Sequence, residues 1–330
     1  MRVVVLGAGS WGTTVASLLT GRHATLLWAR DPDVADEVNQ QRTNTRYLPN
    51  CLLPARLEAT ADLDKAVGQA ELLVVGVPSH GFRATLEAAR PNIHPWIPVV
   101  SLSKGLEQGS HLRMTEVIKE ALPGHPAAAL SGPNIAKEIM DGQAAASVIA
   151  TEDLAVAEAL QRVLRRGLLR IYTNDDVIGC ELGGALKNVV ALACGLAQGL
   201  SVGDNTRAAV MTRGLAELTR LGVAMGGRPS TFAGLAGMGD LVATCISPHS
   251  RNRRVGEQLG AGRPLQEILA GMTMVAEGVR TAATVEELAA RHGVEMPVCH
   301  TIYRVVHGDI AAADAYLGLR TPARSEDDPW

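Results

Sequence analysis

Lys187 is the residue of this sequence whose setting most favours proton-transfer chemistry. Lysine is rare in the chain, with five lysines against 26 arginines, and Lys187 falls in the small and apolar segment Gly183–Ala191. An ammonium group in such a segment must find a partner or lose its charge. A lysine desolvated in this way can exchange the proton of a secondary alcohol while a nicotinamide exchanges the hydride. Taken alone, the same residue could also be a surface lysine whose stem crosses apolar neighbours.

Two further charged residues could act beside such a lysine. Lys104 follows the apolar run Ile97–Leu102, and residues just after the strands of an open α/β sheet lie at its ligand-binding edge. Lys104 could polarise a carbonyl group or bind an anion, or it could be a solvated loop residue. Asp240, in a glycine-dense segment, could hold Lys187 in place and tune its proton affinity, or it could cap a helix.

The segment Ser250–Arg254 is a candidate phosphate-binding site. It places three arginines beside Ser250 and Asn252 ahead of a helical pattern. Guanidinium groups and the backbone N–H groups of a helix start together suit a phosphate dianion. A short basic run also fits a solvated face or a nucleic-acid patch, although no Phe lies beside it to stack on bases. Glu277 could accept a hydrogen bond from a ribose hydroxyl or simply begin a helix.

The segment Gly7–Gly12 reads Gly-Ala-Gly-Ser-Trp-Gly, a complete G-x-G-x-x-G motif. It follows the apolar run Arg2–Leu6 and precedes a helical pattern, which is the context that dinucleotide binding requires. Gly7 permits a tight turn, Gly9 lets backbone N–H groups approach a pyrophosphate, and Gly12 lets the helix pack closely on the strand. We therefore predict a site for NAD or NADP.

The end of the second strand in this kind of fold reads the adenosine ribose, and here it supplies Arg30 followed by Asp31. An acidic residue would accept a hydrogen bond from the ribose 2′-hydroxyl of NAD, whereas Arg30 could cradle the 2′-phosphate of NADP or stack on adenine. Because Asp31 precedes Pro32, it could equally be a turn or helix-cap residue. We expect Arg30 to contact the cofactor, and the choice between the two cofactors stays open.

Positioning these residues requires a parallel sheet followed by a bundle of helices. In the first part of the chain, short Val- and Leu-rich runs alternate with helical patterns, as in consecutive βαβ units. The fold class is therefore α/β, with an N-terminal Rossmann-type, mostly parallel sheet over residues 1–178. The predicted strands are Arg2–Leu6, Ala24–Trp28, Glu71–Val77, Ile97–Leu102, Ala127–Leu130, Ala146–Ala150 and Leu169–Tyr172.

The pattern changes near Val177, after which strand-like runs largely disappear. We predict a second, all-helical and substrate-binding domain over residues 179–330, with a flexible tail at 321–330. Its predicted helices are Val177–Gly199, Thr206–Gly222, Arg251–Gly260, Glu277–His292 and Cys299–His307.

Composition excludes several classes of partner. A formal net charge of −3 gives no global attraction to nucleic acid or acidic lipid. Lys187 and Asn188 interrupt the longest apolar stretch, so no membrane insertion is expected. The nine histidines show no metal-ligand spacing, and we predict no metal. The cysteines form no Cys-x-x-Cys pair and fit buried thiols in a reducing, cytoplasmic compartment; they are Cys51, Cys180, Cys194, Cys245 and Cys299.

Taken together, these segments resemble the bacterial NAD(P)-dependent glycerol-3-phosphate dehydrogenases. The matching pieces run from Gly7 to Glu277 in the order and approximate spacing of that family. They are Gly7–Gly12, Ser103–Gly105, Ser131–Ala136, Gly184–Asn188, Gly239–Leu241, Ser250–Arg254 and Glu277–Gly278.

The resemblance implies a reaction and a set of site residues. Lys187 would accept a proton when sn-glycerol 3-phosphate is oxidised and donate one when dihydroxyacetone phosphate is reduced. The implied substrate contacts are Lys104, Gly132, Asn134, Lys187, Asp240, Ser250, Arg251 and Asn252. The implied cofactor contacts, beyond the three glycines, are Ser10, Trp11, Arg30, Lys104, Ala136, Arg251, Val275 and Glu277. The family also suggests a cytoplasmic homodimer that supplies glycerophospholipid synthesis.

Two other functions remain compatible with the sequence. A related 3-hydroxyacid or ketopantoate-type reductase also pairs this nucleotide fold with a lysine in a helical domain, and phosphate binding at Ser250–Arg254 would distinguish it. A non-catalytic redox sensor would bind the dinucleotide and signal to a partner without turnover.

Overall fold

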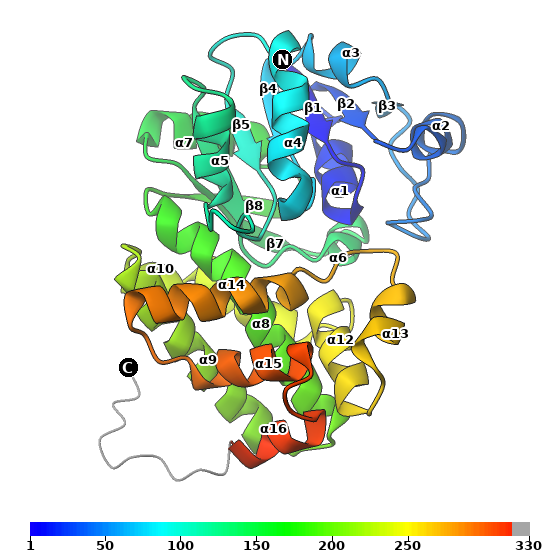
Figure 1. Ribbon diagram of the computed structural model, residues 1–330. Coiled ribbons are helices and arrows are strands. Elements are labelled where there is room, and N and C mark those ends of the chain that lie inside the picture. The colour runs from blue at the N-terminus through cyan, green and yellow to red at the C-terminus, as the bar shows by residue number, and fades with distance from the viewer. Residues whose placement is uncertain (319–330) are drawn as a thin grey trace. The chain divides into compact units, whose positions relative to one another are not determined.

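The structure, a computed structural model, describes residues 1–318 and divides into two compact units (Figure 1). The first unit is Met1–Val177, and the second begins at Ile178. The tail predicted over residues 321–330 lies outside the described residues.

The first unit contains one eight-stranded sheet with the order β3-β2-β1-β4-β5-β6-β7-β8. Neighbouring strands are parallel except β6 and β7, which are antiparallel. The strand order reverses between β1 and β4, and ligands of such sheets bind at the carboxyl ends of the strands that flank this point. The strands are β1 (Arg2–Leu6), β2 (Ala24–Trp28), β3 (Glu58–Thr60), β4 (Leu72–Val75), β5 (Val99–Ser101), β6 (Ala127–Ser131), β7 (Ala145–Ala150) and β8 (Leu169–Asn174).

The Rossmann-type, mostly parallel sheet predicted from the sequence is confirmed. Each predicted strand is present with its ends within two residues of the expected ones. The edge strand β3 was missed, because it has only three residues and begins with an exposed Glu58, so it lacks the apolar run that marks the buried strands.

Helices cover both faces of this sheet (Figure 1). Alternate residues of a strand point to opposite faces, and accordingly Val3 and Val5 belong to one apolar core while Val4 and Leu6 belong to the other. The first core includes residues of α1, α2, α6 and α7, and the second includes residues of α3, α4 and α5. The helices are α1 (Ser10–Leu19), α2 (Pro32–Gln41), α3 (Leu63–Val67), α4 (Ser79–Ala89), α5 (Met114–Ala121), α6 (Ala136–Met140) and α7 (Leu154–Leu164), with a 3₁₀ turn at Arg90–Asn92.

The second unit is helical throughout its described residues, as predicted. The five helices expected from the sequence are present, and shorter ones that the sequence analysis did not predict lie between and after them. The helices are α8 (Val177–Gly199), α9 (Asp204–Ala224), α10 (Pro229–Phe232), α11 (Asp240–Ile246), α12 (Arg251–Gly260), α13 (Leu265–Ala270), α14 (Glu277–His292), α15 (Pro297–His307) and α16 (Ala312–Gly318), with a π-helical turn at Leu235–Gly239.

The central helix of the second unit is α8. It is long and apolar enough to count as a candidate membrane span, but 94% of the relevant window is buried within the protein. That degree of burial is typical of the core helix of a globular unit. Lys187 and Asn188 interrupt this apolar segment, and both side chains are buried in the structure.

A buried carboxylate joins two helices of the second unit. Glu217 of α9 is 1% exposed and accepts hydrogen bonds from the backbone N–H groups of Val298 and Cys299, at 2.8 and 3.1 Å. These groups belong to the first turn of α15, where backbone N–H groups have no partner within the helix. Burial raises the pKa of Glu217, while the two backbone hydrogen bonds act in the opposite direction.

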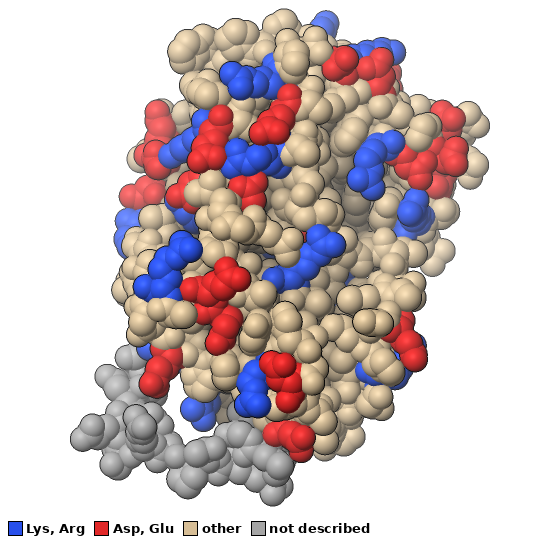
Figure 2. Space-filling model, viewed as in Figure 1, with Lys and Arg blue, Asp and Glu red and all other residues tan. Residues whose placement is uncertain are grey.

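Charges of both signs alternate on the face of the molecule in Figure 2, without one large basic area. Among the described residues, no group of three or more His, Cys, Asp or Glu side chains is arranged to hold a metal ion. All five cysteines are buried free thiols, as the sequence analysis predicted.

Candidate active site

The glycine motif forms the tight turn between β1 and α1. Gly7 has a φ of +108°, and a Cβ atom on Gly12 would lie 2.0 Å from the carbonyl oxygen of Gly7, so the strand and helix meet closely there. A Cβ atom on Gly9 would contact nothing within 4 Å. Gly9 is also the N-cap residue of α1 and provides no side-chain cap. The turn therefore leaves open space in front of backbone N–H groups, which is what a pyrophosphate requires.

Trp11 lies in the first turn of α1 and offers a hydrogen-bond donor. Its Nε1 atom is buried and has no hydrogen-bond partner within residues 1–318, although a buried indole N–H normally finds one. Trp11 and Ala136 pack against the same apolar core. An unpaired buried donor in the helical turn that follows Gly9 fits a bound dinucleotide, so these residues are compatible with NAD or NADP.

Arg30 and Asp31 follow β2 and have different environments. One carboxylate oxygen of Asp31 accepts from the backbone N–H of Asp33 at 3.1 Å and caps α2, while the other pairs with Arg46 at 2.9 Å. Both oxygens thus have partners inside the fold, in agreement with the cap that the sequence left as an alternative. Arg30 is exposed at the carboxyl end of β2.

Lys104, Gly132 and Asn134 come together beyond the ends of β5 and β6. Lys104 Nζ donates to the carbonyl oxygen of Gly132 at 2.6 Å. Asn134 Oδ1 accepts a hydrogen bond from the hydroxyl of Ser147 in β7. Within the described chain, the buried Nδ2 atom of Asn134 and Oγ atom of Ser131 have no partner. An unpaired buried polar group lowers the stability of the folded protein by about 1–3 kcal/mol. Binding of a ligand that pairs with these atoms is therefore favoured.

Lys187 lies in the middle of α8 and is 4% exposed. Its Nζ atom donates to Asp240 Oδ1 and to Thr244 Oγ1, both at 2.5 Å. Asp240 is 1% exposed and begins α11, so the amine and the carboxylate form a buried ion pair. The pairing of Lys187 with Asp240 is one of the two roles that the sequence allows for Asp240, and the structure contains it.

Two residues of this group were missed by the sequence analysis. Thr244 stands four residues after Asp240 on one face of α11 and contacts Lys187. Asn188 is buried beside Lys187, and its Oδ1 atom accepts from Asn252 Nδ2 at 2.9 Å. The i, i+4 spacing of Asp240 and Thr244 could have indicated that Thr244 shares the face of Asp240, whereas nothing in the sequence indicated the partner of Asn188.

Ser250 and Asn252 hold the start of α12. Ser250 Oγ accepts from the backbone N–H of Arg253 at 3.3 Å as the N-cap. Asn252 is 7% exposed, and its Oδ1 atom accepts from the backbone N–H of Gly278 at 2.9 Å. Asn252 therefore connects the start of α12 to the start of α14 and, through Asn188, to α8.

The three arginines of this segment have different environments. Arg251 Nη1 donates to the carbonyl oxygen of Val275 at 2.8 Å, and burial lowers the pKa of its guanidinium while the charge of Glu277 acts in the opposite direction. Arg253 is used within the fold, since it donates to the carbonyl oxygen of Ser247 at 3.0 Å and pairs with Glu257 at 3.5 Å. Arg254 is exposed. Of the three arginines in the predicted phosphate site, Arg251 is thus the partly buried one that contacts Val275 and lies near Glu277.

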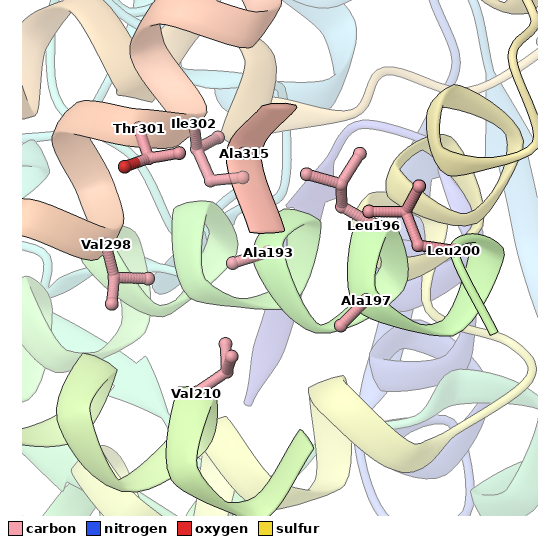
Figure 3. Close-up of a pocket in the computed structure, with 9 residues that line it drawn as sticks. All are labelled: Ala193, Leu196, Ala197, Leu200, Val210, Val298, Thr301, Ile302 and Ala315. Carbon is pink, nitrogen blue, oxygen red and sulfur yellow. The ribbon is translucent and has the colours of Figure 1, made fainter. Parts of the chain in front are cut away.

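A separate apolar pocket occurs in the second unit (Figure 3). Residues of α8, α9, α15 and α16 line it, and none of them has a titratable side chain. The lining residues are Ala193, Leu196, Ala197, Leu200, Val210, Val298, Thr301, Ile302 and Ala315. It offers no titratable group for proton transfer or anion binding, so the polar residues described above remain the candidates for the active site.

Comparisons with known proteins give matches over nearly the whole chain. Residues 2–157 match the family described as NAD-dependent glycerol-3-phosphate dehydrogenase N-terminus, and residues 176–316 match the corresponding C-terminus. The chain is 56% identical over 319 residues to glycerol-3-phosphate dehydrogenase [NAD(P)+] 2 of Sphingopyxis alaskensis, covering 97% of this chain and 96% of that protein.

Solved structures give the same result. The crystal structure of glycerol-3-phosphate dehydrogenase from Coxiella burnetii matches with a TM-score of 0.93 and 36% identity, over 97% of this chain and 99% of that one. A ketopantoate reductase from Ralstonia eutropha matches with a TM-score of 0.61 and 16% identity, over 96% of this chain and 100% of that one. At that identity the second likeness shows a shared fold alone.

Proposed function

The chain belongs to the NAD-dependent glycerol-3-phosphate dehydrogenase family, and on that premise we propose that it interconverts dihydroxyacetone phosphate and sn-glycerol 3-phosphate with NAD or NADP. It is an oxidoreductase that acts on a secondary alcohol. The alternative of a 3-hydroxyacid or ketopantoate-type reductase has no support beyond the shared fold.

The observation that carries the proposal is the buried contact of Lys187 with Asp240 and Thr244. In the direction of oxidation, the hydroxyl proton of the substrate passes to the amine of Lys187 as the hydride leaves C2. In the direction of reduction, the ammonium of Lys187 donates a proton to the carbonyl oxygen, which becomes the C2 hydroxyl. Asp240 stabilises the ammonium form and, with Thr244, fixes the direction of the Nζ atom. A bound nicotinamide supplies or accepts the hydride.

Residues of the first unit would hold the cofactor. The open backbone at Gly9 would bind the pyrophosphate, and Trp11, with its unpaired Nε1 atom, would contact the dinucleotide together with Ser10 and Ala136. Arg30 would contact the adenosine end. Lys104 would contact both cofactor and substrate. Further cofactor contacts proposed from the second unit are Arg251, Val275 and Glu277.

The remaining residues would bind the phosphate-bearing substrate. Arg251 offers a guanidinium in a setting where burial disfavours its charge, so an anion placed there would be strongly attracted. Ser250 and Asn252 flank it at the start of α12. In the first unit, Asn134 offers its unpaired Nδ2 atom beside Gly132. Anchoring the phosphate would orient C2 for reaction, since correct positioning supplies much of the rate enhancement of enzymes.

We also propose the cellular setting that the family suggests. The enzyme would act in the cytoplasm as a homodimer and supply sn-glycerol 3-phosphate to glycerophospholipid synthesis. The five buried free thiols agree with a reducing compartment.

The proposal is tested by following the absorbance of NADH and of NADPH, each in turn, with dihydroxyacetone phosphate as substrate. We expect turnover with the phosphorylated ketone and at least ~100-fold lower kcat/KM with dihydroxyacetone, because a charge-assisted contact to the partly buried Arg251 is lost. Equal rates with both ketones would contradict the proposal. Binding of dinucleotide with no turnover on either would instead identify a sensor.

A further inference from the structure

Ser147 of β7 lies next to the turn that carries Gly132 and Asn134. The turn approaches β7 closely, since a Cβ atom on Gly132 would lie 3.1 Å from the Cα atom of Ser147 and 3.3 Å from the carbonyl oxygen of Ala146. Gly132 has a φ of +120°, which favours glycine. Ser147 itself is 0% exposed. Its hydroxyl group is thus enclosed and faces the loop instead of solvent.

The hydroxyl of Ser147 has one role in this setting. It hydrogen-bonds to Asn134 Oδ1, and because a carboxamide oxygen can only accept, the hydroxyl must be the donor. This bond ties the Asn134 carboxamide to β7 through its oxygen, with Nδ2 as the end that Ser147 does not use. Without it, the carboxamide would lose its contact with β7 and could rotate about its last side-chain bond.

In this arrangement the donor Nδ2 lies where the described residues offer no acceptor. Asn134 Nδ2 is buried and has no hydrogen-bond partner in the described part of the chain. An NH₂ group can be satisfied only by an acceptor, so a ligand atom that pairs with it must be an oxygen or nitrogen bearing a lone pair. The neighbouring Lys104, bonded to the carbonyl of Gly132, brings a positive charge to the same turn.

We propose that Ser147 is a positioning residue for the reaction, which holds the Asn134 carboxamide so that Nδ2 donates a hydrogen bond to an oxygen of the phosphorylated ketone. This inference rests on the proposed function and adds a residue to which no substrate contact was assigned from the sequence. Ser147 acts only through Asn134. Its removal should therefore weaken substrate use without affecting cofactor binding or the fold.

The first test replaces the hydroxyl. Ser147→Ala should raise the KM for dihydroxyacetone phosphate and lower kcat/KM about three- to tenfold, the effect of one net hydrogen bond. The dissociation constant of NAD(P)H should stay unchanged. Ser147→Thr retains a hydroxyl and should recover most of the lost kcat/KM. Ser17→Ala is the matched control, because it removes a buried hydroxyl whose hydrogen bond stays within α1, and it should leave KM unaltered.

The second test concerns Asn134. Asn134→Asp keeps an acceptor for Ser147 but replaces the NH₂ donor by a negative charge, and it should lower kcat/KM by at least ~100-fold, because an anionic substrate is then repelled. Asn134→Ala should lower kcat/KM by itself, and adding Ser147→Ala to it should cause no further loss, since both changes break the same contact. Asn134 is half-buried, so the two Asn134 single variants and Ser147→Thr also serve if Ser147→Ala does not fold.

The outcomes separate this inference from the proposed function. A wild-type enzyme that fails to reduce dihydroxyacetone phosphate would overturn both. An active wild type with a Ser147→Ala variant of equal KM, or with additive losses in the double variant, would overturn the role of Ser147 alone. A rise in the dissociation constant of NAD(P)H with an unchanged KM would also overturn it, because the carboxamide would then serve the cofactor.

Discussion

Replacing Lys187 by Ala should abolish most turnover while leaving cofactor binding intact. Proton transfer by a positioned side chain contributes roughly 10²–10⁴-fold, so we expect kcat to fall by at least ~100-fold, about 2.7 kcal/mol in activation free energy. None of the hydrogen bonds or contacts described for the β1–α1 turn involves Lys187. The dissociation constant of NADPH, measured by fluorescence titration, should therefore change less than about twofold.

The same substitution should also destabilise the fold, because it leaves the Asp240 carboxylate buried at 1% exposure without its cation. Breaking a buried ion pair by removing one partner costs about 3–5 kcal/mol. Adding Asp240→Asn removes the uncompensated charge, so the double variant should recover a large part of this free energy of unfolding and none of the turnover. Urea denaturation of the wild type, the double variant and Lys187→Ala measures their free energies of unfolding, which should fall in this order.

Two results would refute this reasoning about Lys187. A Lys187→Ala enzyme with kcat within about tenfold of the wild type would show that another group carries the proton. A double variant less stable than Lys187→Ala would show that the buried Asp240 charge is not what the single substitution leaves uncompensated. A variant that loses both turnover and NADPH binding would indicate general unfolding and not a catalytic defect.

Three further predictions concern the first unit. Gly9→Ala should leave the melting temperature unchanged but weaken NAD(P)H binding at least ~10-fold, because its Cβ atom meets only the open space at the turn. Gly12→Ala should instead lower the melting temperature, since its Cβ atom would lie 2.0 Å from a backbone oxygen. Burial and the charge of Arg166 lower the pKa of His23. The folded state therefore binds a proton at His23 less readily than the unfolded state, and the free energy of unfolding should fall as pH drops below about 6.5. His23→Gln should reduce the loss of stability between pH 8 and pH 5, measured by urea denaturation. Arg30→Ala should raise the KM for NADPH more than that for NADH, and equal changes would show that Arg30 does not read the 2′-phosphate.

The parts of the fold that the sequence predicted well are those encoded by local pattern. The central strands are apolar on both faces because helices cover them, and such runs are visible in the sequence. The glycine turn is equally local, since Gly7 and Gly12 meet across a few residues. Short elements are different: α10 has four residues and β3 has three, too few to display a period of 3.6 or 2.

Local pattern also left the role of Asp31 undecided. A ribose-binding acid and a helix N-cap both follow a strand and precede a helix, so the two interpretations share one sequence signature. The structure contains the N-cap, since one oxygen of Asp31 accepts from the backbone of Asp33, and the other oxygen pairs with Arg46. The pairing with Arg46 crosses 15 residues, a separation at which no spacing rule applies.

The contacts of Lys187 also could not be predicted from local sequence pattern, because they join residues far apart in the chain. Its rarity and apolar setting marked it in the sequence, yet its partners Asp240 and Thr244 lie 53 and 57 residues away. The pairing with Asp240 could be suggested from charge alone, because a buried ammonium needs a counter-charge. Thr244 carries no charge, and only the helical face shared with Asp240 brings its hydroxyl to the amine.

Asn134 and Asn252 differ in their hydrogen bonds, although the family resemblance implies a substrate contact for both. Asn134 uses only its oxygen within the described fold and leaves Nδ2 unpaired. Asn252 uses both ends, accepting from the backbone of Gly278 and donating to Asn188. A buried network of this kind is costly to break because each remaining member loses its partner. Substitution of Asn252 should therefore disturb the packing of α8, α12 and α14 as well as substrate binding, whereas substitution of Asn134 should act mainly through the ligand.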